Sequence, residues 1–381
     1  MSGRVVGGGT AAQPPDGDGT AAPPPLLEDD VPLAPLTTLE LGGHARHLVR
    51  ATGDEEVARA LAWAAARKLA LVVLGGGSNV VVSDDGLDGV VLKMETRGVR
   101  FEPDGLVTAA AGEPWGAFVD ATVARGYAGL ECLTGIPGLV GATPIQNVGA
   151  YGQEVGEVIR EVRALARRTG EVVRLAPEDC AFGYRDSRFR RQPEDYVVLG
   201  VTFALRPGGA PTVAYKELED ALVAQGIVGE ARTVAAVGRT VRALRAKKSM
   251  ILDPDDPNHR SVGSFFTNPV LAEKAFEALA ARAVTAGVVT SPDRVPRFDL
   301  GSGRRKVPAA WRIERAGFPK GLRRGAVGIS SVHALALVHH GGGTTHALLA
   351  LCTEIQTGVH ARFGVSLERE PIFLGAGPPG S

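Results

Sequence analysis

One internal stretch rich in glycine and proline limits what this chain can fold into. Residues 133–156, LTGIPGLVGATPIQNVGAYGQEVG, contain six glycines and two prolines, too many for a regular helix or strand. A loop of this length inside a compact domain is usually functional or disordered. Because this loop has few charges and several small residues, we expect it to be ordered. Thr143, Gln146, Asn147 and the backbone around them could line a flat aromatic cofactor; an Ω-loop without a ligand is the alternative.

Composition and charge exclude several classes of protein. The chain has 381 residues, enough for about two or three domains, and its 44% hydrophobic and 22% charged residues are ordinary for a soluble globular protein. Basic and acidic residues both number 42, and this balance argues against a protein that coats nucleic acid or an anionic membrane. No apolar run approaches the roughly 18 residues of a membrane-spanning helix. We therefore expect neither a nucleic-acid nor a membrane partner.

The cysteines and histidines give no sign of a metal site. Cys132, Cys180 and Cys352 are far apart and odd in number, which argues against a zinc ribbon or a disulfide framework. The eight histidines form neither an H-x-x-x-H nor an H-E-x-x-H motif. We expect no metal and a reducing, cytoplasmic location.

The first 34 residues differ from the rest of the chain. They are rich in Gly, Pro, Asp and Ala, contain no aromatic residue and lack the apolar segment of a signal peptide. Such a sequence buries too little apolar surface to offset its chain entropy. We expect a disordered tail over residues 1–34.

Beyond the tail, hydrophobic periodicity predicts a mixed α/β chain. Helical spacing indicates helices over 54–69, 115–125, 233–248, 271–284, 308–317 and 345–364. Short apolar runs indicate strands over 44–50, three within 70–93, and others over 105–111, 158–165, 171–175, 197–205, 261–270 and 365–375. The pattern changes near residue 236, which indicates a separate α/β lobe after it.

A glycine run lies between two of these β-branched segments. Gly75-Gly76-Gly77-Ser78-Asn79 is neither G-x-G-x-x-G nor a Walker A loop, because Val80 takes the last position and no Lys-Ser/Thr follows. A tight glycine turn can still present backbone N–H groups to a pyrophosphate, with two polar side chains adding donors. A plain β-turn is the alternative.

Three later motifs carry side chains suited to chemistry. Arg185 in FGYRDS stands among glycine and aromatic residues that could hold it rigidly toward an anion; an ordinary surface arginine is the alternative. Ser264 in GSFFTNP could donate a proton from a dry pocket, or be incidental in a core strand. Glu368 and Glu370 share one face of the last strand, where a solvated edge is the usual meaning.

Taken in order, LGGGSN, GLECLTGIPGLVGATPIQNVGAYGQE, FGYRDS, GSFFTNP and LEREPIFLG resemble the UDP-N-acetylenolpyruvoylglucosamine reductase family in sequence and spacing, over roughly residues 36–375. The resemblance implies an α/β (α+β) fold. It consists of a two-part FAD-binding domain of the vanillyl-alcohol-oxidase-like (PCMH) type and a C-terminal α/β substrate-binding domain. We expect subdomains over 35–104 and 105–236 and the C-terminal domain over 237–376, with its last strand returning to the active site.

The resemblance also implies non-covalent FAD, since no histidine or cysteine matches a covalent attachment site. The pyrophosphate would be held by Gly75, Gly76, Gly77, Ser78 and Asn79. The flavin would be lined by Ile136, Pro137, Gly138, Thr143 and Gly149.

The implied activity is NADPH-dependent reduction of UDP-N-acetylglucosamine enolpyruvate to UDP-N-acetylmuramate, a peptidoglycan precursor. Ser264 matches the serine that protonates the intermediate. Arg185 and Glu370 match the pair that polarises the substrate carboxylate and stabilises the enol. A carboxylate anion would repel the developing negative charge, so we expect Glu370 to have a raised pKa.

The resemblance also implies substrate contacts. Tyr215 would close over the diphosphate, and Lys248, Asn268 and His333 would contact other parts of the substrate. The choice between Lys247 and Lys248 stays open. We expect a monomer. Two other functions are possible: an FAD-dependent oxidase or dehydrogenase of the same fold with another substrate, and a non-catalytic nucleotide-binding protein.

Overall fold

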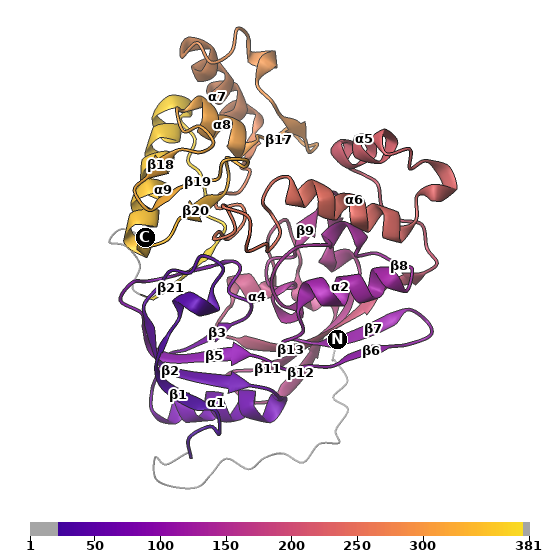
Figure 1. The fold of residues 1–381 in the computed structure, drawn as a ribbon, viewed down its shortest axis with the longest axis vertical. Coiled ribbons are helices and arrows are strands. Elements are labelled where there is room, and N and C mark those ends of the chain that lie inside the picture. The colour runs from indigo at the N-terminus through magenta and orange to yellow at the C-terminus, as the bar shows by residue number, and fades with distance from the viewer. Residues whose placement is uncertain (1–21, 376–381) are drawn as a thin grey trace.

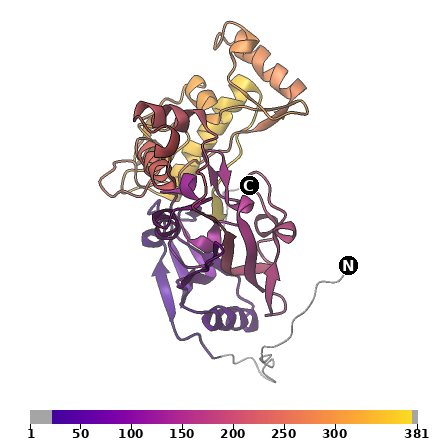
Figure 2. The same cartoon turned by 90° about the vertical axis from the view of Figure 1, so that its right-hand side faces the viewer.

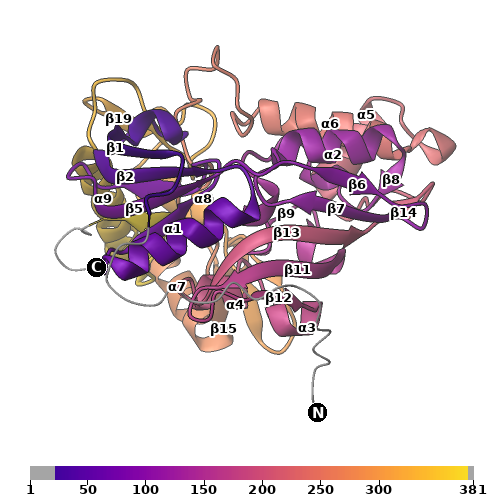
Figure 3. The ribbon, with the colours of Figure 1, turned by 90° about the horizontal axis from the view of Figure 1, so that it is seen from below.

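The computed structural model describes residues 22–375, which form two lobes in the ribbon view (Figure 1). The N-terminal part begins with a sheet in the order β1-β2-β5-β3. Its strands are β1 (Leu27–Pro32), β2 (His44–Ala51), β3 (Leu71–Leu74) and β5 (Leu87–Met94). Helix α1 (Asp54–Ala66) packs against β2 and β5, and Figure 3 shows it running across this sheet.

Strand β1 corrects the expectation of a disordered tail over 1–34. It pairs antiparallel with β2, and Leu33 just after it is fully buried. Acidic side chains of β1 pair with basic ones of β2: Glu28 with Arg50 (2.8 Å), Asp29 with His47 (2.6 Å) and Asp30 with His44 (2.8 Å). Composition alone missed this match, because the partners come later in the sequence. Residues 1–21 of the expected tail lie outside the described residues.

A second sheet, entirely antiparallel, has the order β12-β11-β13-β7-β6. Its strands are β6 (Val99–Phe101), β7 (Leu106–Ala110), β11 (Ile159–Ala166), β12 (Val172–Leu175) and β13 (Tyr196–Ala204). The expected boundary at residue 104 falls inside the β6–β7 hairpin, so the change between sheets comes before Val99. The aromatic rings of Trp115, Phe118 and Phe203 pack together in the core of this part.

Helices and short strands surround this sheet. The helices are α2 (Trp115–Ala124), α3 (Pro177–Cys180), α4 (Arg188–Arg191), α5 (Lys216–Ala224) and α6 (Val234–Ala246). The short strands are β8 (Tyr127–Ala128), β9 (Gly149–Ala150), β10 (Gln153–Glu154) and β14 (Arg206–Pro207). Within 133–156 the backbone forms only 3-10 turns and the two-residue strands β9 and β10, as the glycine and proline content predicted.

The C-terminal lobe has a core of its own and rises above the two sheets (Figure 2). Its helices are α7 (Glu273–Thr285), α8 (Ala309–Arg315) and α9 (Thr345–Phe363), close to the expected ranges. Its small sheets are β15 (Val270–Ala272), β17 (Arg304–Lys306) and β16 (Phe298–Asp299), and β18 (Arg323–Arg324), β19 (Val327–Ile329) and β20 (Leu337–His339). Helix α9 ends at Gly364, whose φ of +70° suits glycine.

Two segments of this lobe differ from expectation. The expected strand over 261–270 makes only isolated bridges, at Ser261 and Phe266, before β15 begins at Val270, because Gly263 takes a φ of +73° and interrupts the extended backbone. In the last segment, regular pairing is limited to β21 (Ile372–Leu374), which runs parallel to β4 (Val80–Val82). The chain thus returns from the C-terminal lobe to the strand that follows the glycine run. Among residues 22–375, no helix combines the length and apolar character needed to cross a bilayer.

Candidate active site

The glycine run forms the turn between β3 and β4 and lines a cleft. A Cβ at Gly77 would lie 2.1 Å from the carbonyl oxygen of Leu36, and one at Gly76 would lie 2.8 Å from the Cα of Gly138, so larger residues do not fit. Within the described chain, no group accepts a hydrogen bond from the backbone N–H of Gly76, Gly77, Ser78 or Asn79. A turn with consecutive unpaired N–H groups is a natural cradle for a phosphate anion.

The 133–156 loop forms the facing wall. Ile136, Pro137, Gly138, Thr143 and Gly149 all line the same cleft. The hydroxyl of Ser78 donates to the carbonyl of Pro137 (3.3 Å), and the amide of Asn79 donates to Oε1 of Gln146 (2.9 Å). The structure therefore brings every expected FAD contact to one place.

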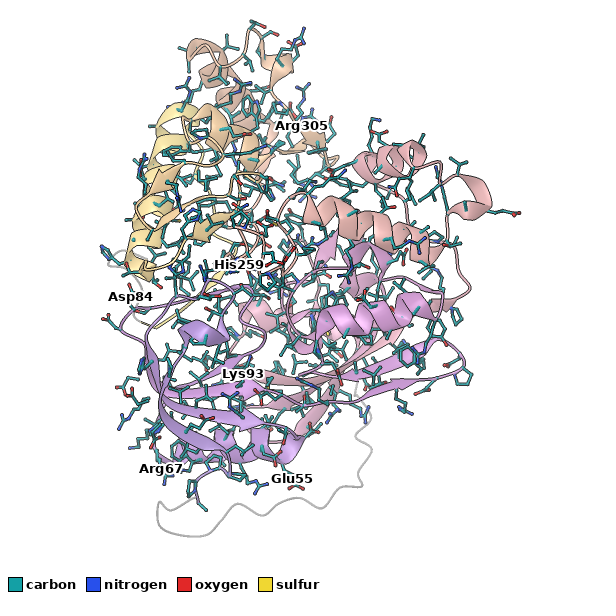
Figure 4. The ribbon with its side chains drawn as sticks, in the orientation of Figure 1. Glu55, Arg67, Asp84, Lys93, His259 and Arg305 are labelled. Carbon is teal, nitrogen blue, oxygen red and sulfur yellow. The ribbon has the colours of Figure 1, made fainter. Side chains whose placement is uncertain are left out.

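The cleft extends from the glycine turn and the 133–156 loop to the segment around Ser264 and Glu370. The space enclosed by these walls, including the part open to solvent, is about 1430 Å³. His259 lines the cleft and lies between the lobes in Figure 4. Lys93 lies on the sheet side of the cleft, and its ammonium donates to the carbonyl of Gly75. The unpaired N–H groups and the close glycine contacts together fit FAD.

The expected catalytic residues line this cleft too. The Nε of Arg185 lies 3.4 Å from Oε1 of Glu370, and Ser264 borders the same space. The backbone N–H of Glu370 donates to the carbonyl of Phe265 at 3.0 Å, which holds Glu370 beside the serine segment. Residues from three distant parts of the sequence thus meet at one point.

The electrostatics of Glu370 agree with the expectation. Burial raises the pKa of the Glu370 carboxyl, and the positive charges of Arg185 and Arg190 only partly oppose it. The expected raised pKa is confirmed. A carboxyl of this kind can hold a proton beside a developing anion.

Sequence comparisons point to one family. A family profile described as "FAD binding domain" matches residues 45–176, and "UDP-N-acetylenolpyruvoylglucosamine reductase, C-terminal domain" matches residues 255–374. The UDP-N-acetylenolpyruvoylglucosamine reductase of Streptomyces coelicolor is 48% identical over 91% of this chain and 90% of its own length. The chain belongs to the UDP-N-acetylenolpyruvoylglucosamine reductase family. The reductase of Saccharopolyspora erythraea is likewise 48% identical, over 90% of this chain and 94% of its own length.

The fold agrees with a solved member of the reductase family. The crystal structure of UDP-N-acetylenolpyruvylglucosamine reductase from Thermus caldophilus aligns with a TM-score of 0.62 at 23% identity, covering 91% of this chain and 98% of that one. The expected architecture, an FAD-binding domain followed by the reductase C-terminal domain, is confirmed.

The expected substrate residues of this reductase lie outside the cleft lining, and most of them form a second cluster. Lys248 donates to Oε2 of Glu217 at 2.7 Å and lies 5.7 Å from the ring of Tyr151, which packs edge-on against Tyr215. Burial, aided by the positive charge of Lys248, lowers the pKa of His333 to about 4.

Asn268 has a structural contact of its own. Its Oδ1 accepts a hydrogen bond from the backbone N–H of Ala309 (2.8 Å), at the start of α8. The two residues after Ser264, Phe265 and Phe266, are buried in the core of the C-terminal lobe and anchor the serine segment from behind, rather than lining the cleft.

Sequence reasoning missed Arg245, which lines the cleft from the end of α6. Its Nη2 donates to the carbonyl of Met250 (2.6 Å), while its buried Nε has no partner among the described residues, and burial lowers its pKa to about 10. A signal was present: Arg245 follows Val241 by four residues and so falls on the apolar face of the helix. No cluster of metal-ligating side chains occurs in residues 22–375.

Proposed function

We propose that this cleft carries out the NADPH-dependent reduction of UDP-N-acetylglucosamine enolpyruvate to UDP-N-acetylmuramate. The observation that carries the proposal is the half-buried Arg185–Glu370 pair, which lines the same cleft as Ser264, the glycine turn and the 133–156 loop. Membership of the reductase family supports the same reaction.

FAD would be held between the two walls of the cleft. The unpaired N–H groups of Gly76 to Asn79 receive its pyrophosphate, and the backbone around Pro137, Thr143 and Gly149 lines its flavin. When bound there, FAD would supply the redox chemistry, the relay of a hydride from NADPH to C3 of the enolpyruvyl group.

Arg185 and Glu370 bind the carboxylate end of the enolpyruvyl group. As C3 gains the hydride, negative charge spreads onto this carboxylate, and a fixed guanidinium stabilises it. Burial raises the pKa of Glu370, which favours its uptake of a proton, and the protonated carboxyl would donate a hydrogen bond instead of repelling the charge. Both groups are in position before the substrate arrives, so little reorganisation is needed.

Ser264 donates the proton that C2 requires. A serine hydroxyl is a weak acid and acts only on a strongly basic carbanion in a site that excludes water. The buried Phe265 and Phe266 fix the position of its backbone from the core side. Removal of the hydroxyl is therefore expected to stop the second half of the reaction without disturbing the first.

The nucleotide part of the substrate would extend toward the cluster of Tyr215, Lys248 and His333. With a pKa of about 4, His333 is neutral at physiological pH, so it contributes a hydrogen bond and Lys248 contributes the charge. The Oδ1 of Asn268 is occupied by Ala309, which leaves its amide N–H groups to donate to substrate. The enzyme works as a monomer in the cytoplasm, without a nucleic-acid or membrane partner.

The decisive experiment measures NADPH oxidation with and without the enolpyruvyl sugar nucleotide, while absorbance follows the flavin. We expect purified protein to be yellow, to bleach on addition of NADPH, and to turn over only when the sugar nucleotide is present. A yellow protein that NADPH does not bleach would favour an oxidase of the same fold. A colourless protein would favour a non-catalytic nucleotide-binding role.

A further inference from the structure

Arg185 stands in a backbone conformation that needs support. Its φ of +53° lies in the left-handed region, which is uncommon for a residue with a long side chain. It belongs to a four-residue turn in which Gly183 and Asp186 exchange backbone hydrogen bonds of 2.9 and 3.2 Å. Ser187, just after the turn, is buried and its hydroxyl donates to the carbonyl of Ile145, which fixes the far end of the turn. The near end, at Gly183, must also be held if Arg185 is to point into the cleft.

Asn147 holds the near end of the turn, from the same 133–156 loop. Its side chain is only 3% exposed, and its Nδ2 donates both to the carbonyl of Gly183 (3.0 Å) and to Oε2 of Glu154 (2.7 Å). Its Oδ1 accepts from the backbone N–H of Gly156 (2.9 Å). Every hydrogen-bonding group of the amide is therefore used, and one of these bonds fixes the turn two residues before Arg185.

Glu154 completes the connection to the cleft. It pairs with Gly149 in the β9–β10 hairpin, and a Cβ at Gly149 would lie 2.8 Å from the Cγ of Glu154, so the two are in tight contact. Burial raises the pKa of Glu154, and the positive charges of Arg185 and Lys306 oppose this. Arg185 thus lies in the field of two carboxyl groups, Glu370 and Glu154.

We propose that Asn147 and Glu154 form a positioning pair that holds the Arg185 turn against the flavin-lining loop and so aims the guanidinium at the substrate carboxylate. The inference rests on the proposed role of Arg185. Neither residue of the pair needs to touch the reacting atoms. They act through Arg185: Asn147 by a hydrogen bond to its turn, and Glu154 by holding the asparagine amide in orientation.

The sharpest perturbation is Asn147→Asp. Aspartate matches asparagine in size and tolerates the left-handed φ of +44° at this position. It cannot donate, however, so its carboxylate would face the carbonyl of Gly183 and the carboxyl of Glu154 without a hydrogen bond to either. The turn loses its anchor while the volume of the site is preserved.

We expect turnover with the enolpyruvyl substrate to fall about 10–100-fold, the usual effect of misplacing a binding group by an ångström. Affinity for UDP-N-acetylmuramate, measured by calorimetry on the oxidised holoenzyme, should fall about tenfold, because its carboxylate meets the same arginine. Flavin reduction by NADPH should stay within about threefold of wild type, because it needs no carboxylate contact. The double variant Asn147→Asp/Glu154→Gln should recover part of both losses, since the new amide can donate to the aspartate.

Gln153→Ala is the matched control. Gln153 is the neighbouring buried amide of the same hairpin, but it bonds Glu131, Thr212 and the backbone of Cys132, away from the Arg185 turn. It should lower the thermal midpoint without weakening product binding. The proposal is overturned if Asn147→Asp binds product and turns over like wild type, if Gln153→Ala causes the same losses, or if the double variant recovers nothing. An inactive wild-type enzyme would instead refute the proposed function.

Discussion

Arg312 in helix α8 predicts a stabilising substitution. Its side chain is 0% exposed, and within residues 22–375 its Nε, Nη1 and Nη2 have no hydrogen-bond partner. Burial alone lowers its pKa from 12.5 to about 10, so no carboxylate stands near enough to compensate. At roughly 1.36 kcal/mol per tenfold change, this corresponds to about 3 kcal/mol of desolvation cost. Because the folded-state pKa remains far above neutrality, the arginine stays charged and the whole cost is present at pH 7.

Arg312→Leu should remove that cost while filling a similar volume. Replacing a buried charge with a well-packed apolar side chain stabilises proteins by about 1–4 kcal/mol, and we expect about 1–3 kcal/mol here. The assay is thermal and urea unfolding of the FAD-loaded protein, with flavin release as a second probe. Arg315→Leu is the control, since Arg315 lies on the same helix but is exposed and should change stability by less than about 0.5 kcal/mol.

The measured midpoints distinguish an uncompensated buried charge at Arg312 from a guanidinium that has a stabilising partner. A midpoint that rises for Arg312→Leu but not for Arg315→Leu supports an uncompensated buried charge. A midpoint that falls or stays unchanged for Arg312→Leu would refute the reasoning, because it would show that the guanidinium has a stabilising partner in solution. Catalytic constants should not change, since Arg312 is absent from the cleft lining.

Three further predictions test other parts of the molecule. In Ser264→Ala, NADPH should reduce the flavin at close to the normal rate, while reoxidation of the flavin by substrate should slow by more than the ~10²–10⁴-fold typical of general acid catalysis. Ser264→Cys should recover part of the reoxidation rate. If Ser264→Ala reoxidises as fast as wild type, Ser264 is not the proton donor. His333 should cost the wild type up to about 3 kcal/mol of stability as pH falls from about 6.5 to 4, because the unfolded state takes up a proton that the folded state, with its pKa of about 4, resists. His333→Gln should lack this loss of stability. If wild type and His333→Gln lose the same stability between pH 7 and pH 4.5, the prediction is wrong. Deleting residues 1–34 should lower the unfolding midpoint by several degrees, because the deletion removes β1 and Leu33. A deletion that ends at residue 21 should lower the midpoint less. Equal midpoints for the two deletions would show that β1 contributes nothing to stability.

Sequence reasoning succeeded where the physical signal is local. Helix α9 was predicted nearly to its last residue, because apolar spacing defines its buried face and Gly364 ends it. Both strands of the antiparallel pair β11–β12 were predicted, from short apolar runs over 158–165 and 171–175. The FAD contacts were predicted as a set through the family resemblance, and the structure places all of them on one cleft.

The failures share a different cause, which is complementarity between segments distant in sequence. The acidic run of β1 looks unfoldable until it is placed beside the basic residues of β2. Arg245 is the exception, because its position on an apolar helix face was itself a local signal that sequence reasoning overlooked. The contact between Asn147 and Gly183 joins residues 36 positions apart, and neither motif contains a sign of the other.

Strand pairing explains how this reductase fixes Ser264, the proposed proton donor, relative to the glycine turn proposed to hold FAD. Strand β21 runs parallel to β4, the strand that leaves the glycine turn, and the N–H of Ile372 donates to the carbonyl of Asn79 at 3.0 Å. Two residues earlier, the N–H of Glu370 donates to the carbonyl of Phe265, next to Ser264. The cradle, the carboxyl group and the hydroxyl are therefore linked by backbone hydrogen bonds rather than by side-chain docking between lobes. Because a register shift of one residue would turn Glu370 to the opposite face, the chemistry depends on the register of this last strand.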